Sequence, residues 1–289
     1  MPELPEVETI RRQLAPRLVG RSVLDSWAFP SAKFDQAPTA VGHRITDVGR
    51  RGKYLLIGLR PQGADGESIA VGDTGERDEA AELVVHLGMT GRLALDADAD
   101  HAAATDPHPH LRAWWSLDDG RRLTFHDIRR FGRIAVVAAG RYDDLPTLAT
   151  LGPEPDDDAF TGEWLRTEIN RRRRRVKTAL LSQRPVAGVG NIYADEALWR
   201  AGVDPRSRRL TRAAAGRLRD AVRDVLREGV DHGGTTLRDY VDAEGAAGTN
   251  QHRLDCYGRA GQRCHRCDTT LRGAMLDARS TTWCPTCQS

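Results

Sequence analysis

Met1-Pro2-Glu3-Leu4-Pro5-Glu6-Val7-Glu8 opens the chain and leads into the pattern that decides how the first half folds. Apolar residues then recur at spacings of three and four, which indicates an amphipathic helix over residues 5–18. The apolar face of this helix consists of Val7, Ile10, Leu14 and Leu18.

The second residue, Pro2, brings its own chemistry. Because methionine is usually trimmed before proline, we expect Pro2 to head the mature protein with a free secondary amine. An α-amino group titrates near ~8, so part of it is neutral at physiological pH. Glu3 places a carboxyl group beside this amine, and the pair suits Schiff-base chemistry on a sugar or carbonyl carbon. The dipeptide alone is weak evidence, since many proteins begin Met-Pro.

The overall composition is that of a globular protein. A length of 289 residues with 39% hydrophobic residues suggests about two domains with proper cores. There is no run of 18 apolar residues and no secretory pattern at the N-terminus, so we expect a soluble intracellular protein.

The net charge of +2 hides an asymmetry between the two halves. Residues 1–160 carry 19 Lys and Arg against 26 Asp and Glu, whereas residues 161–289 carry 24 against 15. A basic half favours a polyanionic partner such as nucleic acid, although a solvated basic surface would give the same count.

Four of the five cysteines form two Cys-x-x-Cys pairs separated by 16 residues, namely Cys264, Cys267, Cys284 and Cys287. This spacing predicts a four-thiolate zinc site, and four protein ligands leave no open position for catalysis, so the zinc is expected to be structural. Disulfides are the weaker interpretation in an intracellular protein. We expect His265 to be a bystander and Cys256 to be a small buried apolar residue.

The first half has the pattern of a β-sandwich or barrel leaning on the N-terminal helix. Alternating or apolar runs predict strands at 54–59, 83–87, 92–95, 113–117, 122–125 and 133–137. Asp119-Gly120 is a hairpin signal between two of them. Residues 61–82 and 96–110 are expected to be long surface loops.

The second half has a helical pattern after a linker at 151–158. Apolar residues share a face at Leu165, Ile169, Val176 and Leu180. Thr211 is expected to cap a further helix that ends at Gly229, and residues 182–191 are too rich in turn formers for a helix.

Seven short motifs follow the opening octapeptide. They are 50–56 (RRGKYLL), 86–92 (HLGMTGR), 127–132 (DIRRFG), 151–155 (LGPEP), 186–196 (VAGVGNIYADE), 257–259 (YGR) and 279–281 (RST). In order and spacing they resemble the formamidopyrimidine-DNA glycosylases, a bacterial family of DNA glycosylase/AP lyases, nearly from end to end.

This resemblance implies an α+β fold in which DNA lies in a cleft. Residues 1–145 would form the N-terminal catalytic helix and β-sandwich domain, and 146–158 a linker. Residues 159–240 would form a helix–two-turn–helix DNA-binding domain. Residues 241–289 would hold a lesion-loop remnant and the zinc-finger hairpin with one structural Zn²⁺.

The resemblance also implies a bifunctional glycosylase and abasic-site lyase of base excision repair that removes oxidised purines. Pro2 would attack C1′ of the flipped nucleotide, Glu3 would act as general acid/base, and β,δ-elimination would cut the strand. Lys53 would contact the phosphate beside the lesion. No soluble cofactor would be needed, and the partner would be damaged double-stranded DNA.

Further residues match DNA-contacting positions of the family. Met89, Arg129 and Phe131 match a wedge that fills the gap left by a flipped base, although ordinary core packing would also explain Met89 and Phe131. The remaining matches are Glu6, His86, Asn191, Tyr257 and Arg279. Asn191 has a second interpretation as a helix-capping residue.

Some positions depart from the family pattern. Gly248-Thr249-Asn250-Gln251 stands where an aromatic residue is usual, which bears on lesion preference, and the acidic stretch 61–82 has no assigned role. Ile128 replaces a usual Pro, and Asp268 and Ala278 replace usual glycines near the zinc. Asp tolerates a left-handed backbone better than most residues.

Three other functions compete with this prediction. The endonuclease VIII branch, which acts on oxidised pyrimidines, typically has Gly where this chain has Leu4. A non-catalytic damaged-DNA-binding paralogue would not need Pro2, Glu3 and Lys53. A zinc-ribbon transcription factor explains only the last quarter of the chain. We expect a cytoplasmic, nucleoid-associated monomer.

Overall fold

The computed structural model describes residues 1–62, 80–96 and 109–289. The chain forms two compact units. Unit 1 comprises residues 1–2, 6–146 and 236–248, and unit 2 comprises residues 3–5, 147–235 and 249–289. The domain limits expected from the sequence stay predictions. Among the described residues, no helix has both the length and the apolar character needed to cross a membrane.

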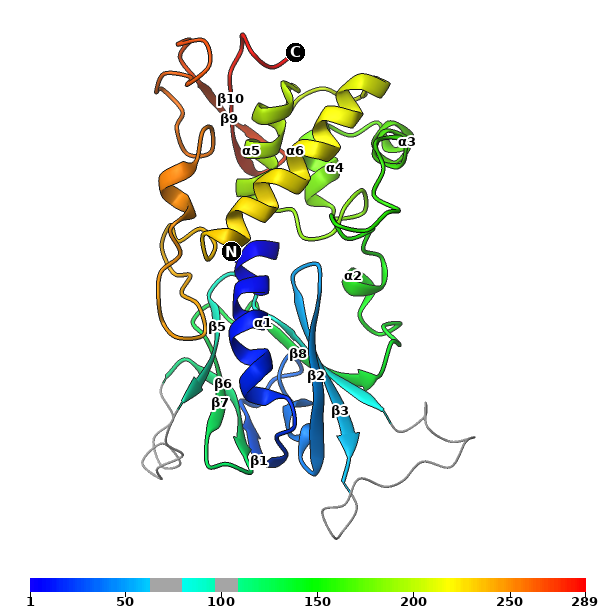
Figure 1. Ribbon diagram of the computed structural model, residues 1–289, viewed down its shortest axis with the longest axis vertical. Coiled ribbons are helices and arrows are strands. Elements are labelled where there is room, and N and C mark those ends of the chain that lie inside the picture. The colour runs from blue at the N-terminus through cyan, green and yellow to red at the C-terminus, as the bar shows by residue number, and fades with distance from the viewer. Residues whose placement is uncertain (63–79, 97–108) are drawn as a thin grey trace. The chain divides into compact units, whose positions relative to one another are not determined.

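Unit 1 is a β-sandwich of two four-stranded antiparallel sheets, as expected from the sequence (Figure 1). One sheet has the order β1 (Val23–Ala28), β6 (Leu111–Leu117), β7 (Arg122–Asp127), β5 (Gly91–Asp96). The other has the order β2 (His43–Arg51), β3 (Tyr54–Pro61), β4 (Ala81–His86), β8 (Arg133–Ala138), and a short 3₁₀ helix, η1 (Ala37–Ala40), accompanies the strands.

Helix α1 (Leu4–Leu18) runs alongside the sheets and closes this core (Figure 1). Val7, Leu14 and Leu18 are fully buried in one cluster with residues of both sheets, among them Leu55, Trp115 and Phe125. The apolar stripe therefore packs as the sequence predicts, and its burial stabilises the unit together with the apolar residues of both sheets.

Two strands, β1 and β2, are not predicted by the sequence pattern. Each buries few side chains, only Val23 in β1 and two in β2, so neither has the apolar alternation that marks a half-buried strand. The predicted hairpin at Asp119-Gly120 is confirmed, with Gly120 at φ 82° between β6 and β7. The loops expected at 61–82 and 96–110 fall largely outside the described residues.

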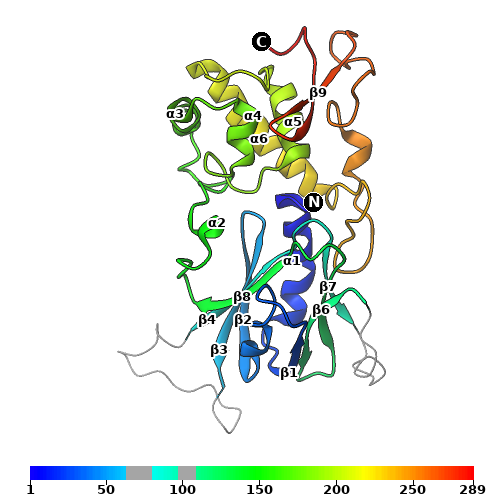
Figure 2. The ribbon, with the colours of Figure 1, turned by 180° about the vertical axis from the view of Figure 1, so that it is seen from behind.

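Unit 2 is helical and ends in a β-hairpin. Its elements are α2 (Pro146–Ala149, whose first residue belongs to unit 1), α3 (Gly162–Arg172), α4 (Val176–Leu181), α5 (Asn191–Ala201), α6 (Arg212–Asp231), the 3₁₀ helix η3 (Asn250–Arg253), β9 (Arg272–Leu276) and β10 (Arg279–Trp283). Helix α5 packs against both α6 and the hairpin (Figure 2).

The shared apolar face from Leu165 to Leu180 belongs to two helices, because Arg173 adopts a left-handed conformation (φ 50°) and ends α3. All four apolar residues nevertheless join one core cluster. The cap at Thr211 is confirmed, since its side chain accepts a hydrogen bond from the Ala214 N–H at 3.2 Å. The helix ends at Asp231, two residues beyond the predicted end.

Candidate functional site

Glu3 is held at the start of helix α5. Glu3 is only 2% exposed. Its carboxylate accepts hydrogen bonds from the N–H groups of Gly190 (2.6 Å), Ile192 (2.9 Å) and Tyr193 (3.4 Å). The first N–H groups of a helix have no partner within the helix and attract anions. The carboxylate is thereby fixed in position, directly after the buried Pro2 in the chain.

The glycines of the Gly188-Val189-Gly190 turn make room for this arrangement. A Cβ on Gly190 would lie 2.3 Å from Cδ of Glu3, and a Cβ on Gly188 would lie 2.5 Å from Cβ of Leu4. Gly188 also has φ +86°, which favours glycine, and its carbonyl accepts from the Leu4 N–H at 3.1 Å. The turn is therefore shaped around Glu3 and Leu4.

Lys53, in the turn between β2 and β3, and His86, at the end of β4, lie close together in unit 1. Lys53 is 3% exposed and precedes Tyr54, which is the cross-strand partner of His86. Burial first, and the Lys53 charge second, lower the pKa of His86 to about 4, so the imidazole is neutral at pH 7. Its Nδ1 accepts from the Gly88 N–H at 3.2 Å, which leaves the proton on Nε2.

Asp127 joins two loops of unit 1 that carry predicted site residues. Its fully buried carboxylate accepts from the Thr90 hydroxyl and from the Gly132 N–H, each at 2.6 Å. The Thr90 hydroxyl accepts in turn from the Arg129 N–H at 3.0 Å. Asp127 has no role predicted from the sequence, although its place at the head of the DIRRFG motif was a signal.

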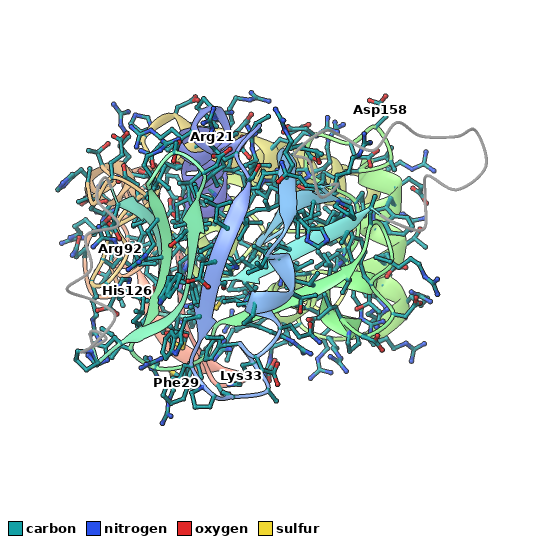
Figure 3. The ribbon with its side chains drawn as sticks, turned by 90° about the horizontal axis from the view of Figure 1, so that it is seen from below. Arg21, Phe29, Lys33, Arg92, His126 and Asp158 are labelled. Carbon is teal, nitrogen blue, oxygen red and sulfur yellow. The ribbon has the colours of Figure 1, made fainter. Side chains whose placement is uncertain are left out.

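The loops so joined present large side chains to solvent. Met89 is 37% and Phe131 50% exposed, so the interpretation of both as core residues is wrong. The Arg129 guanidinium lies 4.9 Å and the Lys33 ammonium 5.8 Å from the centre of the Phe131 ring. Lys33 is labelled in Figure 3, where it appears at the same edge of the view as Phe29 and apart from Arg92.

Two predicted site residues of unit 2, Asn191 and Arg279, lie at the hairpin. Asn191 is the first residue of α5, but it does not cap that helix; its amide instead donates to the Ser280 hydroxyl at 3.2 Å. Arg279, next to Ser280, is exposed at the start of β10. Asn191 and the Arg279 strand thus lie together.

A buried ion pair holds the hairpin strand in this place. The Lys177 ammonium contacts the Asp195 carboxylate and the Ser280 carbonyl, each at 2.7 Å, and Asp195 accepts from the Thr282 N–H at 3.0 Å. Burial outweighs the Lys177 charge and raises the pKa of Asp195 to about 6. Burial also lowers the pKa of Lys177.

Tyr257 is positioned through Glu196, the last residue of the motif at 186–196, for which the sequence predicts no role. The buried Glu196 carboxylate accepts from the N–H groups of Asp255 (2.9 Å), Cys256 (2.9 Å) and Tyr257 (2.7 Å). Burial raises the pKa of Glu196, and these hydrogen bonds oppose the rise. An acidic residue on the apolar face of α5 was the available signal.

Glu6, and Asn250 of the unusual stretch at 248–251, are buried and take part in hydrogen bonds within the protein. Glu6 is 1% exposed, and its carbonyl accepts from the Tyr240 hydroxyl at 3.4 Å. Asn250 is 5% exposed and its amide donates to the Thr235 hydroxyl at 2.9 Å, beside the Tyr193 hydroxyl. Asn250 therefore belongs to a buried polar network within unit 2.

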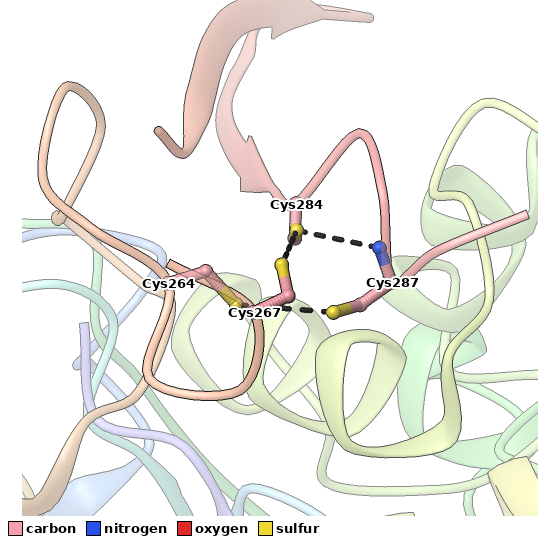
Figure 4. Close-up of side chains that lie close together, drawn as sticks. All are labelled: Cys264, Cys267, Cys284 and Cys287. Atoms are coloured by element: carbon pink, nitrogen blue, oxygen red, sulfur yellow. Dashed lines mark hydrogen bonds between the residues drawn. The ribbon is translucent and has the colours of Figure 1, made fainter. Parts of the chain in front are cut away.

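The four cysteines of the two Cys-x-x-Cys sequences lie together at the base of the hairpin (Figure 4). Their Sγ atoms all lie within 4.8 Å of one another, with 4.0 Å between Cys264 and Cys287 and 3.4 Å between Cys267 and Cys284. A tetrahedral ion with Zn–S bonds of ~2.3 Å needs S···S separations of ~3.8 Å, so the donor set fits structural zinc.

The other predictions around the cysteines also hold. His265 pairs with Asp255 (2.8 Å) rather than joining the thiolates, and Cys256 is fully buried. Asp268 adopts φ 58° and Ala278 φ 62°, so both replacements of glycine accept a left-handed backbone.

We expect a Cys284→Ala variant to lose its zinc and to unfold the hairpin, because the apolar cluster there is small. Metal content by atomic emission and hydrogen exchange over residues 256–289 check this. Cys256→Ala is the matched control and should retain one zinc per chain. A full zinc content in Cys284→Ala would contradict the assigned ligand set.

Family models match most of the chain. Residues 1–134 match the formamidopyrimidine-DNA glycosylase N-terminal domain, residues 151–241 match the H2TH domain of the same glycosylases, and residues 261–289 match a zinc finger found in FPG and IleRS.

Similar proteins extend over the full length. A Deinococcus radiodurans protein named formamidopyrimidine-DNA glycosylase is 42% identical over all of this chain and 97% of its own. A crystal structure of the MutM (Fpg) protein of Thermus thermophilus has a TM-score of 0.84 and 42% identity, and covers 99% of this chain and 98% of that one. A Lactococcus lactis Fpg complex with DNA containing an abasic site has a TM-score of 0.81 at 28% identity, and covers 99% of each chain.

Proposed function

Since the chain belongs to the formamidopyrimidine-DNA glycosylase family and is a DNA glycosylase of base excision repair, we propose that it excises oxidised purines through a Schiff base on Pro2. The observation that carries this proposal is the position of Glu3. Three N–H groups at the start of α5 fix its carboxylate next to the proposed nucleophile.

The proposed reaction uses this pair in sequence. The Pro2 nitrogen attacks C1′ of the flipped nucleotide as the glycosidic bond breaks, and the base leaves with a proton. Glu3 protonates O4′ as the sugar ring opens and the base departs, which leaves an iminium at C1′, and its carboxylate then accepts the C2′ proton in the elimination. Elimination of the 3′ and then the 5′ phosphate cuts the strand, and hydrolysis frees Pro2.

The proposed contacts to DNA phosphate divide between the two units. In unit 1, the Lys53 ammonium would contact a phosphate through its charge, and the neutral His86 would donate a hydrogen bond to a phosphate from Nε2. In unit 2, Asn191 and Arg279 lie together through Ser280, and Glu196 positions Tyr257. Charged and neutral donors of this kind fix a duplex without reading its sequence. We propose that the buried Glu6, whose backbone carbonyl accepts from the Tyr240 hydroxyl, supports helix α1, which follows Pro2.

The proposed wedge consists of Met89, Arg129 and Phe131. A flipped base leaves a gap whose unstacking costs a few kcal/mol, and exposed apolar or planar side chains fill it. Their exposure, and the connection of their loops through Asp127, support this role.

We expect Phe131→Ala to slow base excision about tenfold or more, because nothing then offsets the cost of unstacking at the unfilled gap. Cleavage at a ready-made abasic site should change much less. Single-turnover rates on both substrates check this, with Leu24→Ala on β1 (60% exposed) as the matched control. Equal losses on both substrates would contradict the wedge.

We expect Gly190→Ala to lower excision about a hundredfold, because the new Cβ would displace Glu3 and small misplacements at a reacting centre are costly. Gly216→Ala in α6 is the matched control, since its Cβ meets no atom within 4 Å. Rates are measured together with melting temperature. An unchanged rate in a folded Gly190→Ala variant would show that the position of Glu3 is not critical.

The lesion class distinguishes the proposal from its nearest alternative. Competing duplexes that carry either 8-oxoguanine or an oxidised pyrimidine should show preferential excision of the purine. Preference for the pyrimidine would support the endonuclease VIII-like alternative. Binding without excision of either lesion would support a non-catalytic paralogue.

Oligomeric state and location follow from the same proposal. We infer a monomer that acts on double-stranded damaged DNA in the bacterial cytoplasm, associated with the nucleoid through DNA binding. Structures of Lactococcus lactis Fpg with damaged DNA support the choice of partner.

A further inference from the structure

Two segments of unit 2 gather five arginines around adjoining surface hollows. One hollow, of about 340 Å³, is lined by Arg173, Arg174, Arg175, Thr178, Arg208 and Asp277. The second, of about 420 Å³, is lined by Arg173, Ser207, Arg208 and Arg209. Because they share Arg173 and Arg208, we call them together the arginine hollow.

Backbone contacts hold the two segments against each other. The Val176 N–H donates to the Ser207 carbonyl at 2.7 Å. The Asn170 side chain donates to the Leu210 carbonyl at 3.1 Å and accepts from the Leu210 N–H at 2.8 Å. The arginines thus come together through fixed main chain and not through a chance meeting of flexible side chains.

Most of this charge has no internal counterion. Arg171 and Arg172 lie outside the hollow and pair with Glu168, while Arg175 pairs with Asp277 at 2.6 Å. Among the described residues, no carboxylate lies within ion-pairing distance of the remaining arginines of the hollow, which are Arg173, Arg174, Arg208 and Arg209.

Among the residues that the structure describes, Asp277 is the one acidic residue that lines the hollow. Its hydrogen bond from Thr178 and the charges of Arg175 and Arg208 hold its pKa below the usual range, so it stays ionised. One carboxylate among five guanidinium groups leaves a strong positive excess, and mutual repulsion favours binding of an external anion.

The chemical groups that line the arginine hollow determine which anion can bind there. The lining contains guanidinium, hydroxyl and carboxylate groups, and within the described parts of the chain it includes no aromatic or aliphatic residue on which a base could stack. Guanidinium groups bind phosphate oxygens in bidentate geometry. Asp277 lies in the β9–β10 turn, two residues before Arg279, so the hollow adjoins the hairpin proposed to contact DNA.

We propose that the arginine hollow binds backbone phosphates of the same DNA duplex outside the lesion, so that it lengthens the footprint of the enzyme. This inference rests on the proposed function. It assigns to Arg173, Arg174 and Arg175, and to Arg208 and Arg209, a purpose that excision itself does not require.

Two paired variants test the proposal: Arg173→Gln with Arg208→Gln, and Arg174→Gln with Arg209→Gln. The control is Arg212→Gln with Arg227→Gln, which are exposed arginines of α6 outside the hollow. Affinity for a duplex with an uncleavable abasic analogue is measured across potassium chloride concentrations. A short duplex that ends beside the lesion is compared with one that extends a full turn further on both sides.

On the long duplex, the slope of log K against log salt should fall by about 0.9 for each phosphate that the variant no longer neutralises, with affinity about tenfold weaker at physiological salt. On the short duplex, both variants should bind like the wild type. Excision at saturating DNA should stay within about twofold, since the chemistry of catalysis is untouched.

The proposal would be overturned if both variants kept the wild-type slope of log K against log salt on the long duplex. It would also be overturned if the control variant lost as much affinity as they do. A large loss of excision at saturating DNA would also overturn it, because it would place these arginines at the reacting centre. Absence of excision by the wild type would instead refute the proposed function, so the two failures are distinguishable.

Discussion

Insertion of one glycine between Met1 and Pro2 is expected to abolish both excision and strand cleavage, with rates reduced about a thousandfold or more. The insertion converts the Pro2 nitrogen into an amide, whose lone pair is delocalised and does not attack carbon. A new terminal amine would stand about 3.8 Å away, one Cα spacing from the required position. Such displacement of a nucleophile removes most of its advantage.

Single-turnover excision of 8-oxoguanine from a duplex measures this loss. Affinity for the uncleavable abasic analogue is the control and should remain near that of the wild type, because the proposed phosphate contacts are untouched. Full activity in the insertion variant, with the extra residue verified by intact mass, would contradict the assignment of Pro2 as nucleophile.

The second large effect is expected for Glu3→Gln, which should lower base excision about 10²- to 10⁴-fold, the usual contribution of a general acid or base. The glutamine amide has one acceptor oxygen, whereas the N–H groups of Gly190, Ile192 and Tyr193 all face this side chain. A donor facing a donor costs about 1–3 kcal/mol, so the variant should also be less stable.

Rates on intact lesions and on ready-made abasic sites separate these effects. Base departure needs the acid, whereas Schiff-base formation on an open sugar needs it less, so abasic-site cleavage should fall less than excision. An unchanged excision rate in a folded Glu3→Gln variant would contradict the assigned role of Glu3.

Glu8→Gln is the matched control for this variant. Burial would raise the pKa of Glu8, but Arg11, Arg12 and Arg50 bind its carboxylate and together lower the pKa to about 2. The control should therefore lose stability but keep its excision rate per folded molecule.

The same Glu8 pairing sets an expectation for acid stability. The folded pKa of Glu8 lies below its ordinary value, so its contribution to stability is present above the ordinary pKa near ~4.3 and is lost as pH falls towards about 2.

Periodicity predicted the elements that bury a continuous apolar face. Helix α1, the strands of the central sandwich and α6 with its Thr211 cap all produce strong local patterns. It failed for β1 and β2, which bury little, and at Arg173, where a left-handed residue divides a helical stripe without Gly or Pro to mark it. The backbone conformation at such positions depends on tertiary packing, which a short stretch of sequence does not reveal.

The sequence could predict those residues of the candidate site that lie in recognisable motifs. The Cys-x-x-Cys spacing predicted the thiolate cluster, and the resemblance implied roles for Glu3, Met89 and Phe131, but neither predicted the groups that hold these residues. Asp127 and Glu196 act through backbone N–H groups that are close only after folding. The hydrogen bonds of such residues cannot be predicted from a single sequence, because their partners are main-chain atoms common to every residue.

The central claim, a covalent bond between Pro2 and C1′ of the damaged nucleotide, is tested most directly by borohydride reduction of the enzyme on abasic DNA. Proteolysis and mass spectrometry of the trapped complex should place the sugar adduct on the peptide that begins at Pro2, with Met1 absent. An adduct on a lysine such as Lys53, or active enzyme that retains Met1, would contradict the account.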